Sequence, residues 1–125
     1  MIFVDTNVLM YAVGGAHPLR DEVRARLSAS APGELATSAE VLQELLHRYL
    51  PAGRWLQFDA ALRLVHDRIP VWPIDRDDVE LGRHLADRHP ALTARDLLHL
   101  ATAVNHEATG MWSYDRGLAA AWRRR

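Results

Sequence analysis

The first seven residues constrain the fold more than any other part of the chain. Residues 2–4 (Ile-Phe-Val) form a short apolar run, which predicts a buried strand. Asp5 follows at once, and a helical stretch begins near Val8. Ligands of open α/β sheets bind at the carboxyl ends of the strands, so this position favours a functional role for Asp5. Capping of the next helix by Asp5 or Asn7 is an equally good interpretation of the same residues.

Composition narrows the class of protein. The 125 residues, 49% hydrophobic and 25% charged, are expected to form one domain over residues 1–125. No apolar run approaches the roughly 20 residues of a membrane span, so a cytoplasmic protein is expected. The absence of cysteine excludes disulfides and thiolate metal sites. All 15 basic residues are arginine and the net charge is −1, so any nucleic-acid binding depends on a local arginine patch.

The rest of the chain alternates between short apolar runs and stripes at helical spacing. Strands are expected near residues 2–4, 35–36, 71–72 and 111–112. Helices are expected near residues 7–13, 18–31, 37–50, 55–65, 77–89, 93–109 and 116–122. This order predicts a three-layer α/β/α domain with a mainly parallel, four-stranded sheet.

Four acids are expected to meet at one edge of that sheet. Asp5 and Asp115 follow the first and last strands, and Glu44 and Asp96 lie near the starts of two helices. Helices that follow parallel strands begin at the carboxyl edge of the sheet, so all four carboxylates can converge there.

Two of the helical acids have structural interpretations as well. Thr37 and Glu40 have the spacing of a capping box, which gives Glu40 a structural role and favours Glu44 for chemistry. Thr93 and Asp96 have the same spacing, so capping by Asp96 stays an open alternative.

Four motifs in succession carry a family resemblance. IFVDTN (2–7), SAEVLQEL (38–45), ARDLLHLATA (94–103) and WSYD (112–115) resemble the motifs of PIN-domain ribonucleases, and more narrowly those of VapC toxins. The resemblance runs from Met1 to about Leu118. Family members commonly carry a fifth strand after the last short helix, whereas three arginines follow here, so four strands are expected.

The resemblance implies a site and a reaction. Asp5, Glu44, Asp96 and Asp115 would bind Mg²⁺ or Mn²⁺, with Asn7 and Ser113 supporting them. Mg²⁺ prefers carboxylate oxygens and keeps several waters, which suits hydrolysis of RNA phosphodiester bonds by metal-activated water. The implied protein is an endoribonuclease toxin that cuts a tRNA or an exposed ribosomal RNA loop, forms a homodimer and binds a cognate antitoxin.

Two other classes compete with this reading. A haloacid-dehalogenase-like phosphatase also begins with an Asp at a strand end, but Asn7 stands where a second Asp is expected and the chain has no lysine. A catalytically inactive PIN-like RNA-binding module is the other alternative, and the presence of all four acids argues against it.

The histidines and aromatic residues have simpler interpretations. The seven histidines lack any zinc-binding pattern and are expected at the surface or as satisfied polar residues. The four tryptophans are expected in the core or at a subunit contact rather than stacked on RNA bases. A stripe on the helix at 55–65 is the candidate homodimer surface: Trp55, Phe58, Leu62 and Val65.

Overall fold

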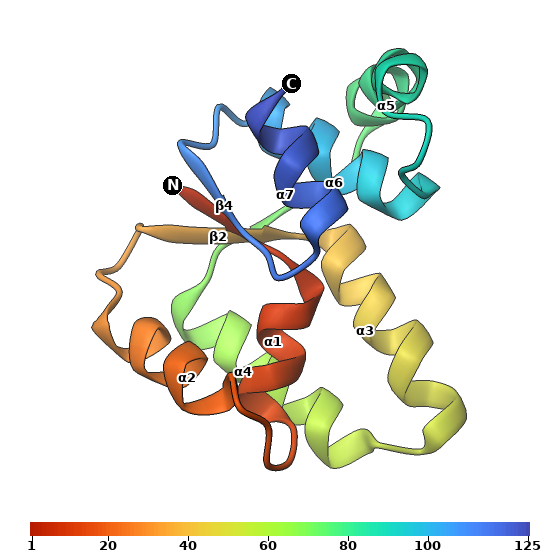
Figure 1. The fold of residues 1–125 in the computed structure, drawn as a ribbon. Coiled ribbons are helices and arrows are strands. Elements are labelled where there is room, and N and C mark those ends of the chain that lie inside the picture. Colours follow the sequence, from red (N-terminus) through yellow and green to blue (C-terminus); the bar gives the residue numbers. More distant parts are fainter.

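A computed structural model describes all 125 residues and shows a parallel sheet covered by helices on both faces (Figure 1). The strands are β1 (Ile2–Val4), β2 (Leu35–Ser38), β3 (Val71–Trp72) and β4 (Gly110–Trp112). Their order is β3-β2-β1-β4, and every neighbouring pair is parallel. The predicted α/β class and four-stranded sheet are confirmed.

Seven helices form the two outer layers: α1 (Thr6–Val13), α2 (Arg20–Ala29), α3 (Ala39–Ala52), α4 (Trp55–Arg68), α5 (Arg76–Arg88), α6 (Ala94–Asn105) and α7 (Arg116–Arg123). On one side α1 packs against α2 and α4, and on the other α6 packs against α5 and α7 (Figure 1). Helix α3 contacts α1, α4 and α6, so it joins both layers. No helix is long and apolar enough to span a bilayer.

The apolar run that opens the chain lies at the centre of the sheet. Phe3 and Val4 are fully buried, because β1 runs between β2 and β4 and helices cover both of its faces. Thr37 donates a hydrogen bond from Oγ1 to the carbonyl of Val4 at 2.8 Å, which ties β2 to the end of β1. Asp5 and the start of α1 therefore follow directly from the buried central strand of the sheet.

Two helix starts differ from the sequence prediction. Helix α2 begins at Arg20, after a turn that contains Pro18. Helix α3 is capped by Ser38, whose Oγ accepts from the Val41 amide at 3.2 Å, and not by Thr37. Because the Thr37 hydroxyl is already bonded to the first strand, it is not available as a cap. The predicted capping box of Thr37 and Glu40 is therefore wrong.

Candidate active site

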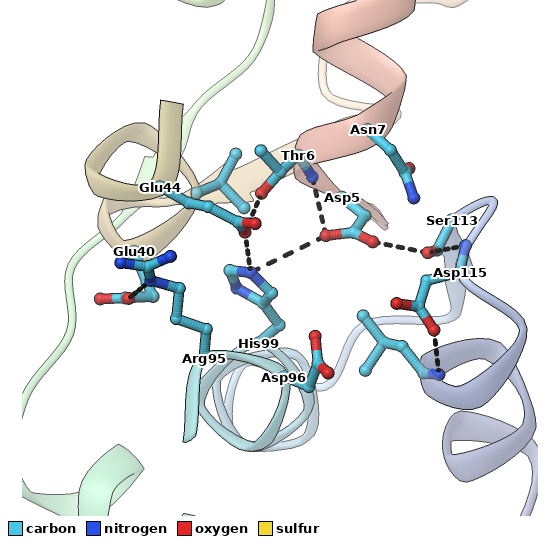
Figure 2. Close-up of polar contacts among 12 residues, drawn as sticks. Asp5, Thr6, Asn7, Glu40, Glu44, Arg95, Asp96, His99, Ser113 and Asp115 are labelled. Carbon is cyan, nitrogen blue, oxygen red and sulfur yellow. Dashed lines mark hydrogen bonds and ion pairs between the residues drawn. The ribbon is translucent and has the colours of Figure 1, made fainter. Parts of the chain in front are cut away.

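Four carboxylates surround one hollow at the carboxyl edge of the sheet. Asp5 ends β1, Glu44 lies in α3, Asp96 lies in the first turn of α6, and Asp115 caps α7. All four line a cavity of about 200 Å³, and Figure 2 shows their carboxylates facing a common space. The order of strands and helices places them together, as the sequence predicts.

Asp5 is the most enclosed of the four acids. Its Oδ1 accepts the Thr6 amide at 2.7 Å, and its Oδ2 accepts the Ser113 hydroxyl at 2.6 Å (Figure 2). Burial raises the pKa of Asp5 above its ordinary value, although His99 and the hydrogen bond from Ser113 act in the opposite direction. The residue also caps α1, so capping is compatible with its place in the hollow.

Glu44 is held by hydrogen-bond donors on three elements. Its Oε1 accepts the Thr6 hydroxyl at 2.7 Å and the His99 Nε2 at 3.1 Å, while Arg48 approaches Oε2 at 3.3 Å. These contacts, the hydrogen bond from His99 foremost, lower the pKa of Glu44 to about 2. Glu44 is therefore a fixed anion at neutral pH.

His99 lies beside Asp5 and Glu44, whereas the sequence predicts all the histidines at the surface or as satisfied polar residues. Its side chain is 1% exposed, and its Nε2 lies between Glu44 Oε1 and Asp5 Oδ1, at 3.1 and 3.8 Å. Its Nδ1 has no hydrogen-bond partner. The signal in the sequence was its spacing: residues three apart lie on one helix face, which places His99 one turn from Asp96.

Asp96 and Asp115 cap helices and face the cavity at the same time. Asp96 and Thr93 form the predicted capping box, with the Asp96 amide 3.2 Å from Thr93 Oγ1 and the Thr93 amide 3.4 Å from Asp96 Oδ2. Asp115 Oδ1 accepts the Leu118 amide at 3.0 Å. Each carboxylate uses one oxygen as a cap, so the capping interpretation does not compete with a role in the site.

The two polar residues expected to support the acids connect the first and last strand ends. Ser113 donates its hydroxyl to Asp5 and accepts the Asp115 amide at 3.0 Å. Asn7 Oδ1 accepts the Tyr114 amide at 3.3 Å. Glu40 points elsewhere, with its Oε1 3.6 Å from Arg95 Nε (Figure 2).

The donor set suits a hard divalent cation. Ligand atoms of Asp5, Glu44 and His99 all lie within 4.8 Å of one another. Carboxylate oxygens dominate the hollow, and oxygen ligands are those that Mg²⁺ and Mn²⁺ prefer. The residues present therefore fit the ion that the family resemblance implies.

Comparison with known proteins finds a family match and similar relatives. The family description "PIN domain" matches residues 2–122. Ribonuclease VapC23 of Mycobacterium tuberculosis is 50% identical over 125 residues, which cover 98% of this chain and 99% of the relative. Ribonuclease VapC13 of the same organism is 45% identical over 123 residues, with 94% and 92% of the two chains covered.

Solved structures share the fold. Mycobacterium tuberculosis VapC20, described as a sarcin-ricin loop cleaving toxin, has a TM-score of 0.82 at 22% identity, over 97% of this chain and 95% of that one. FitAcB of Neisseria gonorrhoeae has a TM-score of 0.75 at 23% identity, over 98% and 94%. A toxin–antitoxin complex from Klebsiella pneumoniae has a TM-score of 0.71 at 22% identity, over 95% and 91%.

Proposed function

This chain belongs to the PIN-domain family, and from that membership we propose that it is a divalent-metal-dependent endoribonuclease, the toxin of a toxin–antitoxin pair. The observation that carries the proposal is the hollow lined by Asp5, Glu44, Asp96 and Asp115. Relatives that are 50% and 45% identical over nearly their whole length are named as ribonucleases, which supports the same activity here.

The four acids would hold Mg²⁺ or Mn²⁺. When bound, such an ion lowers the pKa of coordinated water and neutralises charge that develops on the phosphate. Thr6 and His99 fix one oxygen of Glu44, and Ser113 fixes one oxygen of Asp5. Because these donors already hold the carboxylates in place, the carboxylates need little rearrangement to bind an ion.

The proposed reaction is hydrolysis of a phosphodiester bond in single-stranded or looped RNA. Water adds to phosphorus and the bond to the 3′ oxygen breaks, which leaves a 5′-phosphate and a 3′-hydroxyl. A tRNA or an exposed ribosomal RNA loop is the proposed substrate class. The phosphatase alternative has no support from the family match, and the presence of all four acids disfavours an inactive binding module.

The proposed partners are a cognate antitoxin and a second copy of the chain. Structural neighbours include toxin–antitoxin complexes, such as that of Klebsiella pneumoniae, which supports an antitoxin partner.

Two neighbouring glutamates on α3 give the sharpest test of the proposal. Glu44→Gln should lower RNA cleavage in Mg²⁺ by about a hundredfold or more, because it removes a charge that holds the ion. Glu40→Gln should keep most of the activity, since Glu40 contacts Arg95 outside the acidic hollow. Cleavage of a labelled RNA is measured with Mg²⁺ and with EDTA, and circular dichroism checks folding. Full activity in EDTA, or loss of activity only in Glu40→Gln, would contradict the proposal.

A further inference from the structure

Two arginines line a second hollow that opens directly from the acidic one. This hollow has a volume of about 390 Å³ and is lined by Glu44, Arg48, Thr93, Ala94, Arg95, Asp96 and Asp115. It shares Glu44, Arg48, Asp96 and Asp115 with the first hollow. The two cavities therefore form one surface depression, in which Asp5 lines only the first hollow, Arg95 lines only the second, and Arg48 lines both.

The two guanidinium groups come from different helices. Arg48 belongs to α3 and Arg95 to α6, and these helices contact each other beside the site. Of the 15 basic residues, only these two line either hollow that contains the acids. They are thus the two permanently charged cations that line these hollows.

Both arginines are held loosely enough to change partners. The Arg48 side chain is 54% exposed and lies 3.3 Å from Glu44 Oε2. The Arg95 side chain is 33% exposed and lies 3.6 Å from Glu40 Oε1, which is longer than a hydrogen bond (Figure 2). Both guanidinium groups reach solvent, and ion pairs with a solvent-exposed partner at such distances contribute little stability. Each guanidinium can therefore exchange a carboxylate for another anion at small cost.

An RNA backbone that enters the acidic hollow needs cationic groups beside the carboxylates. The hollow carries four acids and the whole chain has a net charge of −1, so an approaching strand of phosphates meets no general attraction. A phosphate beside the reacting one stays uncompensated unless a cation of the protein contacts it. Arginine suits this role, because its planar fork matches two phosphate oxygens.

We propose that Arg48 and Arg95 form a phosphate-binding subsite for the RNA nucleotide adjacent to the bond that is cut. The subsite rests on the proposed function, since it positions the same substrate. Its ligand is the sugar–phosphate backbone and not a base, so it fixes the position of the strand without reading its sequence.

The test compares four variants in one cleavage assay on a labelled single-stranded RNA. Arg48→Gln, Arg95→Gln and the double variant remove the subsite, and Arg76→Gln is the control. Arg76 is 90% exposed on α5, pairs with Glu80 at 2.6 Å and carries the same charge as the tested residues. The double variant should raise KM about tenfold, the order expected when charge-assisted hydrogen bonds are lost, and Arg95→Gln, which removes no contact of Glu44, should raise KM with kcat almost unchanged. The control should match the wild type.

Salt dependence supplies a second readout. Each lost phosphate contact should flatten the slope of log(kcat/KM) against log salt by about 0.7 for a single strand, or about 1.4 for the double variant. Lysine at both positions should restore most of the slope, because it keeps the charge. Fluorescence anisotropy in an Asp5→Asn background, where the RNA stays intact, should show the same weakening of binding.

Glu40 provides an internal check. If Arg95 only neutralises Glu40, then Glu40→Gln combined with Arg95→Gln will behave like the wild type, and the subsite is wrong. It is equally wrong if the arginine variants match Arg76→Gln, or if kcat falls while KM and the salt slope stay fixed. Failure of the wild type to cleave RNA at all would instead remove the proposed function, and the two failures are therefore distinguishable.

Discussion

At the scale of single residues, Asp5 and Glu44 lie close together, yet the fold shifts their pKa values in opposite directions. Burial raises the pKa of Asp5, and repulsion by Glu44 is the smallest of the contributions to that shift. Glu44 is less enclosed, and the hydrogen bonds from His99 and Thr6 lower its pKa to about 2. The fold therefore opposes the charge of one carboxylate and supports the charge of the other.

This difference predicts opposite effects on the stability of the metal-free protein. The pKa of Asp5 is raised in the folded state, so its stabilising contribution to the free energy of unfolding is present at low pH. That contribution is lost as pH rises through the folded-state pKa. At neutral pH its charge destabilises the fold, and Asp5→Asn should raise Tm in EDTA.

Glu44 behaves in the opposite way. Its stabilising contribution to the free energy of unfolding is present above its ordinary pKa of 4.5 and is lost as pH falls toward about 2. Glu44→Gln should therefore lower Tm at pH 7.

The Tm of both variants is measured by thermal melting in EDTA at pH 7. In a chain of this size, a change of 1 kcal/mol in the free energy of unfolding shifts Tm by about 3–5 °C. Millimolar Mg²⁺ should stabilise the wild type more than Asp5→Asn, because an ion that binds the folded state adds to its stability. A fall in Tm for both variants would mean that burial is not the dominant effect on Asp5.

At the scale of elements, two of the acids, Asp96 and Asp115, line the cavity and also form capping hydrogen bonds at the starts of α6 and α7. Asp115 caps α7 through the Leu118 amide, so its cap and its charge can be separated by mutation. Asp115→Asn keeps a capping oxygen and removes the charge, whereas Asp115→Ala removes both. Both variants should lose RNA cleavage, but only Asp115→Ala should lose about 1 kcal/mol of unfolding free energy. Urea denaturation and the cleavage assay measure the two effects. Equal stability of the two variants would show that the cap is unimportant.

The elements that the sequence predicted well are those with a periodic signal. Alternating strand and helix patterns predicted four strands in a mainly parallel sheet, and acids after strands or near helix starts indicated the edge at which the carboxylates meet. Helix starts were less predictable, because Thr37 and Ser38 are both good caps. The choice between them depends on the hydrogen bond from Thr37 to Val4, a contact between residues 33 positions apart. The position of His99 in the site was not predicted for a similar reason, since its partners Asp5 and Glu44 come from other elements.

At the scale of the whole molecule, the predicted homodimer stripe on α4 is divided between core and surface. Val65 is buried in the core, Phe58 and Leu62 are half-buried, and Trp55 is 45% exposed. Four of the seven exposed large apolar side chains belong instead to α3 and to the first turn of α4, on the two sides of the turn that joins these helices, and they are Leu46, Leu50, Trp55 and Leu56. Exposed apolar side chains that form a patch mark interaction surfaces.

The last prediction concerns assembly through this α3–α4 turn. Light scattering at micromolar concentration should give about twice the 14.1 kDa mass of one chain. Leu56 is 84% exposed and contributes little to the core, so Leu56→Glu should leave the chain folded by circular dichroism while it shifts the mass toward the monomer. Val79→Glu is the matched control, because Val79 is 54% exposed on α5, away from that turn. A wild-type mass of 14.1 kDa would contradict the homodimer. A dimer that survives Leu56→Glu and dissociates in Val79→Glu would place the contact on α5 instead.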